Sequence, residues 1–409
     1  MRIGILSYRS HPFSGGQGIY VRHLSKALLN LGHEVCVISG PPYPDLTENI
    51  DLVKIPSLNL FSAESRLRAF SLKFFFSPVD LIEWLGIMTG GFPEPYTFGK
   101  RVNKFLKNYP ERFDVILDNQ SLCYDLLDIQ EYYPLVTTIH HPITKDHKLE
   151  LENSKDWKER LSTNRWHGFL KMQKQVAPLL KHVVCVSNQS KFDVQDEFKV
   201  KDDAMNVVLN GIDIKTFALR DPDKLIPSRI VTTASADIPL KGLKYLISAL
   251  TNVIKEYPQC HLTVIGKAPS DSIIRTLIRD LNLDDKVSFH SNLSESELVD
   301  IYSSAEIAVI PSLYEGFGFG AGEAMSCGLP LISTTSGGLK EVIGDAAIKI
   351  ESGSSEVIEE AILELFSSSK KREFYAKAGR ERMEKEFDWA LVAKKYLEVF
   401  HKAIEEFKK

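Results

Sequence analysis

The feature of this sequence that most constrains its fold is a regular alternation of short β-branched apolar runs with amphipathic helical stretches. Helical stretches lie, for example, at residues 20–31, 243–255 and 294–304. The apolar runs are predicted strands, first at residues 3–7, 34–39, 115–117, 135–139 and 182–187, then at 206–209, 229–233, 261–265, 286–289, 307–311, 330–333 and 347–350. Strands that alternate with helices form parallel sheets covered on both faces, which predicts an α/β fold.

The two series of strands indicate two domains, because 409 residues exceed what one ordinary core accommodates. We expect two doubly wound, Rossmann-like domains that bind ligands at the C-terminal ends of their strands. The boundary is predicted at residues 201–204, which gives an N-terminal domain of residues 1–204 and a C-terminal domain of residues 205–387. Residues 388–409 are predicted to form an amphipathic helix beyond the last strand.

Composition excludes several classes of protein. A formal net charge of -4 gives no general attraction to nucleic acid, so an anionic ligand must be held locally. No apolar run approaches the roughly 20 residues that span a bilayer, and the N-terminus lacks the pattern of a signal peptide. Five scattered cysteines without a CxxC pair are typical of reduced, buried thiols. We therefore expect a cytoplasmic protein with no nucleic-acid partner.

Residues 57–96 break the alternation with a Phe-rich stretch that also carries basic residues. Leu67, Phe70 and Phe74 fall at helical spacing beside these cations, as in helices at membrane interfaces. One interpretation is a helical insertion packed on its own domain. The other is a lid, or a surface in peripheral contact with the inner face of the membrane, that accepts a lipid-like substrate.

The strongest local signal is a predicted strand, a glycine-laden turn and a helix within residues 307–330. Three glycines lack a Cβ and let a ligand approach the backbone, namely Gly316, Gly318 and Gly320. Amides at the start of the following helix can donate to a phosphate. Glu315 and Glu323 bracket this loop, where carboxylates are poor phosphate ligands but good acceptors for sugar hydroxyls. An isolated pair of this kind would only support the helix dipole.

Glu315 and Glu323, with seven residues between them, resemble the E-x7-E motif of glycosyltransferase family 4, whose members adopt the GT-B fold. Five further segments resemble the family's motifs in the family's order: a glycine loop at residues 13–20, a His-containing loop at 139–142, an NG[VI]D segment at 210–213, the Lys-Gly of 241–242, and the start of a helix that crosses back onto the N-terminal domain at 387–389. The resemblance covers essentially the whole chain. It implies that a hexosyl group moves from a nucleotide-sugar, with UDP-sugars favoured, to a hydroxyl of a glycan or lipid-linked acceptor.

The resemblance also assigns roles on the donor side. Glu323 would accept the ribose hydroxyls, Glu315 would bind a hydroxyl of the transferred sugar, and Lys241 would neutralise the diphosphate. The backbone of Leu293 would contact the base. The remaining donor-side residues would lie close to the diphosphate and the sugar: Gly16, Ser235, Gly318, Phe319 and Gly320.

His140 would sit over the transferred sugar and, with Glu315 and Lys241, complete the catalytic set. Its neighbour His141 competes for that position, and the sequence leaves open which imidazole points inward. On the acceptor side we expect Gly15 and Gly16, with His11 close to the glycine loop.

The sequence departs from the family pattern in one place. Many members carry basic residues where this chain has Ser235 and Leu240, so one or two diphosphate cations are missing. The segment from Asp221 to Asp223 superficially matches a metal-binding DxD motif but is predicted to be a solvated turn. We therefore expect no metal and no cofactor, with Lys241 and helix amides stabilising the leaving diphosphate, and retention by substitution on the front face.

Two other functions remain as alternatives: a nucleotide-sugar-binding protein without turnover, and a GT-B epimerase or phosphorylase. A dehydrogenase is disfavoured, because residues 15–18 do not form GxGxxG and no acidic residue ends the next strand.

Overall fold

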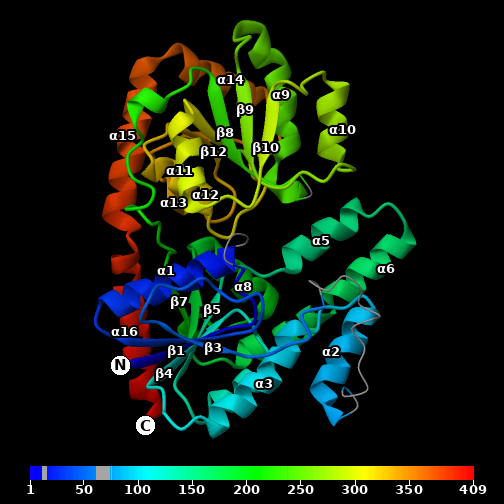
Figure 1. The fold of residues 1–409 in the computed structure, drawn as a ribbon, viewed down its shortest axis with the longest axis vertical. Coiled ribbons are helices and arrows are strands. Elements are labelled where there is room, and N and C mark those ends of the chain that lie inside the picture. Colours follow the sequence, from blue (N-terminus) through cyan, green and yellow to red (C-terminus); the bar gives the residue numbers. More distant parts are fainter. Residues whose placement is uncertain (12–15, 61–73, 75, 237) are drawn as a thin grey trace. The chain divides into compact units, whose positions relative to one another are not determined.

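The computed structural model describes the chain except for residues 12–15, 61–73, 75 and 237 (Figure 1). The chain divides into two compact units. The N-terminal unit consists of Met1–Val208 together with Val392–Lys409, and the C-terminal unit consists of Leu209–Leu391. Each unit contains one parallel sheet flanked by helices, as the alternation in the sequence predicts.

The sheet of the N-terminal unit has seven strands in the order β3-β2-β1-β4-β5-β6-β7. Their bounds are β1 Arg2–Ser7, β2 Glu34–Ser39, β3 Asp51–Lys54, β4 Val115–Asn119, β5 Leu135–Ile139, β6 Val183–Cys185 and β7 Met205–Val207. Ile5 at the centre of β1 pairs with Val37 of β2 and with Leu117 of β4. The strand order therefore reverses between β1 and β4, which is the ligand-binding point of a doubly wound sheet.

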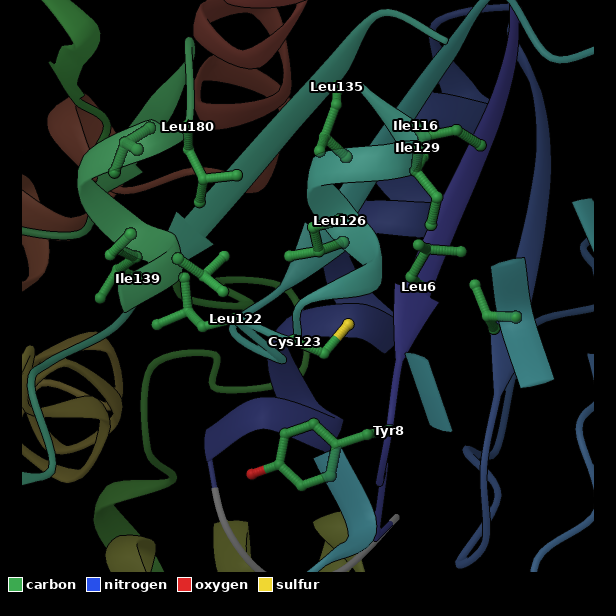
Figure 2. Close-up of a cluster of buried hydrophobic side chains, with 14 of the residues drawn as sticks. Leu6, Tyr8, Ile116, Leu122, Cys123, Leu126, Ile129, Leu135, Ile139 and Leu180 are labelled. Carbon is green, nitrogen blue, oxygen red and sulfur yellow. The ribbon is translucent and has the colours of Figure 1, made fainter. Parts of the chain in front are cut away.

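Helices cover both faces of this sheet. Their bounds are α1 Gly16–Asn30, α2 Pro78–Met88, α3 Glu94–Asn108, α4 Asp125–Ile129, α5 Thr144–Asn153, α6 Trp157–Trp166, α7 Leu170–Val176, α8 Asn188–Phe198 and α16 Trp389–Phe407. Apolar residues of α3, α4, α7 and α8 join one buried cluster with strand residues such as Leu6 and Ile139 (Figure 2). Thr138 points to the opposite face from Ile139, where its hydroxyl lies 3.0 Å from those of both Tyr20 of α1 and Tyr396 of α16.

The sheet of the C-terminal unit has six strands in the order β10-β9-β8-β11-β12-β13. Their bounds are β8 Arg229–Thr233, β9 His261–Ile265, β10 Val287–His290, β11 Ile307–Ile310, β12 Leu331–Thr334 and β13 Ile348–Ile350. The helices are α9 Leu243–Glu256, α10 Ile273–Asp280, α11 Glu295–Ser304, α12 Phe319–Ser326, α13 Leu339–Ile343, α14 Ser355–Ser367 and α15 Ser369–Glu386. The order reverses between β8 and β11, so the C-terminal ends of these two strands position any ligand.

One predicted strand was assigned to the wrong domain. The run at residues 206–209 was predicted to open the second series, but β7 (Met205–Val207) pairs with β6 at the edge of the first sheet. The polar residues before it form a turn from Asp202 to Ala204 that links α8 to β7 rather than a linker between domains. Polarity alone does not distinguish a surface turn from a domain boundary, and the division falls at Val208 and Leu209.

The Phe-rich segment is only partly described. Residues 61–73, and with them Leu67 and Phe70, lie outside the described part of the chain. Phe74 is buried, Phe76 is 90% exposed, and α2 begins at Pro78 with the Ser77 hydroxyl accepting from the amide of Asp80. None of the described helices is both long and apolar enough to cross a membrane.

Candidate functional site

The glycine loop between β11 and α12 is held by close packing as well as by backbone conformation. Gly318 has a φ of 108° at the start of α12, and a Cβ there would lie 2.5 Å from Leu339. A Cβ on Gly320 would lie 2.6 Å from the Thr233 hydroxyl at the end of β8. Glycine at these two positions therefore lets α12 begin close to the reversal point of the sheet, whereas the sequence analysis assigned these glycines to the close approach of a ligand.

Lys241 and Glu315 form an ion pair in this loop region, with Lys241 Nζ 2.6 Å from Glu315 Oε1. The same Oε1 accepts a hydrogen bond of 3.0 Å from the Ser312 hydroxyl. Both side chains remain partly exposed, Lys241 at 29% and Glu315 at 14%. The sequence predicted both as site residues but gave no sign that they contact each other.

Backbone contacts hold this ion pair in place. Gly242, which follows Lys241, has a φ of 66°, and a Cβ there would lie 2.0 Å from the carbonyl oxygen of Pro311. The amide of Leu313 donates to the carbonyl of Leu240 at 2.7 Å. The loop after β8 and the loop after β11 are therefore locked together, which fixes the Lys241 ammonium over the C-terminal ends of the central strands.

Glu323 is buried on α12, and its Oε2 accepts a hydrogen bond of 3.0 Å from the hydroxyl of Tyr302. The Tyr302 oxygen lies 3.2 Å from the Thr233 hydroxyl, so a polar chain runs from β8 to the carboxylate. Burial raises the pKa of Glu323 to about 7. Oε1 of Glu323 accepts no hydrogen bond from any residue that the structure describes. That oxygen is therefore available to a hydroxyl of a ligand.

Ser235 contributes to the loop through its hydroxyl, which accepts a hydrogen bond of 3.3 Å from the amide of Lys267. The amide of Ala236 donates to the Lys267 carbonyl at 2.8 Å, so the loops after β8 and β9 are joined. The exposed side chain of Lys267 thus starts next to the position where family members carry a cation. Sequence reasoning missed this lysine, because it lies far from Ser235 along the chain. Leu293 lies in the loop between β10 and α11.

In the N-terminal unit, His140 directly follows β5 and joins a partly buried polar network. Its Nε2 lies 2.7 Å from Asn119 Oδ1, and the Asn119 amide nitrogen donates to the Ser7 hydroxyl at 3.1 Å. Because the amide nitrogen is committed to Ser7, the oxygen must accept, and Nε2 carries the proton. The Tyr20 ring packs edge-on at 4.8 Å. Burial, with a smaller contribution from His141, lowers the pKa of His140 to about 3, so the imidazole is neutral and Nδ1 is an acceptor.

His141 has a different environment. Its Nε2 lies 3.2 Å from Asp146 on α5, and its carbonyl accepts from the Gln120 side chain at 2.7 Å. The Gln120 oxygen in turn accepts from the amide of His140 at 2.6 Å. His140 is therefore the imidazole integrated into the strand ends, which supports it over His141 as the functional residue.

Asp118, Asn119 and Gln120 at the end of β4 were not predicted as site residues. The predicted strand ended at residue 117, whereas β4 continues through Asn119 and buries both polar side chains. Asp118 accepts from the amide of Ser121 at 3.0 Å, and burial raises the pKa of Asp118 to about 7. Polar residues that directly follow an apolar run were the available signal, since strands of doubly wound folds carry functional groups at their C-terminal ends.

The described residues that were predicted on the acceptor side lie at or beside the start of α1. Gly16 is the first residue of α1, and a Cβ on Gly18 would lie 2.1 Å from the carbonyl oxygen of His11. His11 therefore follows β1 and packs against the first turn of the helix. Gly15 lies outside the described residues.

The structure thus gathers the predicted residues in two groups, one in each unit. Lys241, Glu315, Glu323, Ser235 and the start of α12 meet at the β8–β11 reversal. His140, His11 and Gly16 lie at the C-terminal end of the first sheet. Asp221 is a turn residue as predicted, since it accepts from the amide of Asp223, and Asp213 likewise accepts from the amide of Lys215. Within the described ranges, no three His, Cys, Asp or Glu side chains cluster in a metal-binding arrangement.

Known proteins resemble both halves of the chain. Residues 14–216 match the family described as Glycosyltransferase Family 4, and residues 221–382 match the family described as Glycosyl transferases group 1. Over 409 residues the chain is 39% identical to the MMP alpha-(1->4)-mannosyltransferase of Mycolicibacterium hassiacum, covering 99% of this chain and 98% of that protein.

Solved structures share the fold at lower identity. Sucrose-phosphate synthase from Thermosynechococcus elongatus superimposes with a TM-score of 0.75 at 20% identity, over 99% of both chains. Anabaena Alr3699/HepE in complex with UDP and glucose gives a TM-score of 0.70 at 16% identity, over 98% of this chain and 100% of that chain.

Proposed function

This chain belongs to glycosyltransferase family 4 and is a GT-B glycosyltransferase, and from that premise we propose that it transfers a hexosyl group from a nucleotide-sugar to an acceptor hydroxyl, with retention and without a metal. The relative from Mycolicibacterium hassiacum is named a mannosyltransferase, which makes mannose the first sugar to test. A UDP-sugar remains the prediction from the sequence resemblance, and the corresponding GDP-sugar is the donor to compare with it.

The observation that carries this proposal is the group at the β8–β11 reversal. It combines one ammonium, the first amides of α12 and two carboxylates within two connected loops and the helix that follows them. The ammonium and amides suit a diphosphate, whereas the carboxylates suit hydroxyl donors. In this proposal the diphosphate replaces Glu315 as the ionic partner of Lys241. The Glu315 carboxylate then accepts a hydrogen bond from a sugar hydroxyl. Glu323 Oε1 accepts a ribose hydroxyl.

The proposed reaction needs no protein nucleophile. The bond from the anomeric carbon to the leaving phosphate oxygen breaks, and the acceptor oxygen bonds to the same face of that carbon. The acceptor proton passes to the leaving phosphate oxygen. Lys241 and the amides of α12 stabilise the charge that develops on the diphosphate. Neutral His140 accepts at Nδ1 a hydrogen bond from a hydroxyl of the transferred sugar and so orients the sugar ring.

The test is a thermal-shift or calorimetric titration with UDP, GDP, ADP and their sugar conjugates in the presence of EDTA. We expect one nucleotide-sugar to stabilise the protein, and we expect Glu323→Ala to abolish that effect. Transfer to a free mannoside, followed by the configuration of the product, would then test retention. Binding without transfer or hydrolysis would favour a nucleotide-sugar-binding protein, and release of a sugar epimer or sugar phosphate would favour an epimerase or phosphorylase.

A further inference from the structure

The N-terminal unit contains an apolar pocket of about 550 Å³ that the proposed function does not use. α2 supplies Ile82 and Leu85, the start of α3 supplies Tyr96, and the segment around α7 supplies Phe169 and Met172. A volume of this size lies within the range of ligand sites in proteins, about 300–1,000 Å³. Met172 is buried at the base, whereas Ile82 and Leu85 are 42% and 47% exposed at the rim.

Phe92 connects this pocket to the acceptor end of the first sheet. Tyr8 follows β1 directly (Figure 2), and its ring lies 6.1 Å from the ring of Phe92. On the other side, Phe92 packs against Trp166 at 5.1 Å and against Phe169 at 5.4 Å. The pocket therefore begins one aromatic ring away from the strand end where His11 and Gly16 lie.

The lining favours a hydrocarbon over a sugar. None of the residues that line the pocket carries a carboxylate or an amide side chain, and the polar groups of the lining are the hydroxyls of Thr89, Tyr96 and Tyr124 and the guanidinium of Arg165. Burying a hydroxyl without a partner is unfavourable, so a saccharide would bind poorly here. Aliphatic and aromatic side chains instead gain from covering methylene groups.

Arg165 adds a charge to this apolar wall. Its guanidinium donates to the Thr89 hydroxyl at 2.6 Å, and a Cβ on Gly91 would lie 3.1 Å from its Cζ. Arg165 forms no ion pair with a carboxylate among the described residues, and its side chain is exposed at the end of α6. An arginine without a carboxylate partner at the edge of an apolar pocket suits the anionic group of an amphipathic ligand.

We propose that this pocket binds an alkyl or acyl chain of the acceptor, with an anionic group of the same molecule at Arg165. This inference rests on the proposed function, because it assigns the chemistry of the acceptor. The shared chemistry is one hydrocarbon chain next to a negative charge, whether the molecule is free in solution or resides in a membrane.

The first experiment measures calorimetric binding of alkyl α-mannosides from methyl to decyl, below their micellar concentrations. A fully buried methylene contributes about 0.8 kcal/mol, or about fourfold in affinity. We expect at least a roughly tenfold gain from butyl to octyl, and then a plateau when the pocket is full. Equal affinity along the series would overturn the inference.

Two variants locate the binding. Leu85→Gln should remove most of the dependence on chain length, whereas Leu179→Gln should keep it, since Leu179 is 58% exposed and does not line the pocket. Both positions are exposed, so neither substitution should prevent folding. Arg165→Gln should weaken the binding of octyl phosphate by about tenfold while leaving the affinity for octyl mannoside unchanged. Retention of the full chain-length effect in Leu85→Gln would contradict the proposal.

Flotation with phosphatidylglycerol and phosphatidylcholine vesicles separates the two sources of the chain. Flotation that depends on Leu85 and Arg165 indicates a membrane-resident acceptor, and chain-length-dependent binding without flotation indicates a soluble amphipath. Nucleotide-sugar binding with a flat alkyl series would overturn this inference and leave the transferase function standing. A steep alkyl series without any nucleotide-sugar binding would overturn the proposed function and the acceptor assignment with it.

Discussion

The C-terminal ends of the two sheets carry different kinds of polar pair. At the β8–β11 end of the C-terminal unit, Lys241 and Glu315 form an ion pair whose side chains remain partly exposed. At the end of the first sheet, His140 and its partner Asn119 form a neutral network, and burial raises the pKa of Asp118 to about 7. The same doubly wound topology therefore supports an ion pair at one end and a neutral histidine–amide pair at the other, while burial raises the pKa of one carboxyl to about 7 at each end, Glu323 and Asp118 respectively.

We propose that this difference divides the roles in glycosyl transfer between the two sheet ends. A diphosphate needs cations and amides that exchange partners at little cost, which a partly exposed ion pair provides. A neutral sugar needs fixed acceptors and donors, which a buried network provides because its members are held in one geometry. The proposed division predicts that charge substitutions act mainly in the C-terminal unit and that shape or tautomer substitutions act mainly in the N-terminal unit.

The largest expected effect comes from removing the cation. Lys241→Met should lower kcat by roughly 10²–10³-fold, because a preorganised group that stabilises transition-state charge contributes this much. Lys244→Met is the matched control at the second residue of α9, where the ammonium lies over the Tyr245 ring, and it should change kcat little. Steady-state kinetics with saturating donor measures kcat for both variants. Equal losses in the two variants would show that the charged end is not specific to Lys241.

The next effect separates function from stability at Glu323. Glu323→Gln should weaken donor binding by about 10–100-fold, since a charged acceptor is lost. The raised pKa, about 7, favours the protonated carboxyl in the folded state. The cost of burying the ionised Glu323 carboxylate is therefore absent below pH 4.5 and fully present above pH 7. At pH 8 the free energy of unfolding of the variant should exceed that of the original protein by up to about 3 kcal/mol. Denaturant unfolding at pH 5 and pH 8 measures this, and a stability gain that is equal at both values would contradict it.

At the neutral end we expect a smaller loss of activity and the opposite dependence on pH. His140→Gln should lower kcat/KM by about tenfold through loss of one oriented hydrogen bond. Because the pKa of His140 is lowered from its ordinary 6.5, the folded state loses stability as pH falls below 6.5. The variant should lose that part of the acid dependence, while His290→Gln, at an exposed position, should keep it. Unfolding curves between pH 4 and pH 8 compare them.

The smallest effect concerns the cation that Ser235 does not supply. Lys267→Ala should weaken donor binding by about two- to fivefold, which is the scale of an exposed charge. Ser235→Arg in that background should restore the affinity, because it places a guanidinium on the neighbouring loop. Lys255→Ala at the far end of α9 controls for net charge. Titration of the original protein and the three variants with the preferred nucleotide-sugar measures these affinities. An unchanged affinity in Lys267→Ala would show that Lys267 does not contribute to the donor site.

Most of the fold was predictable, because alternation of strand and helix is a local property of the sequence. β2, β5, β8 and β9 begin and end at the predicted residues. β3 was missed because its four residues are half exposed and carry charge at both ends, which gives no apolar run. β7 was assigned to the wrong sheet because an edge strand of three residues contains no information on its neighbour.

The site was predictable as a set of residues and not as a set of contacts. Glycine turns and flanking carboxylates lie close together in sequence, so Glu315, Gly318 and Glu323 could be found. The partners of Lys241 and Glu323 could not, since Glu315 and Tyr302 reach them only through strand order. Asn119 was hidden for the same reason, because its contact with His140 joins neighbouring strands that are separated along the chain.

The helix α16 has a consequence for synthesis on the ribosome. Val392–Lys409 belongs to the N-terminal unit, and Tyr396 and Phe400 are fully buried there. The hydroxyl of Tyr20, near the beginning of the chain, donates to that of Tyr396 at 2.8 Å. Domains usually complete their folding in the order of translation, but here Leu209–Leu391 emerges before the residues that close the earlier core. The half of the protein made first is therefore the half finished last, and a nascent chain must keep that apolar face covered in the meantime.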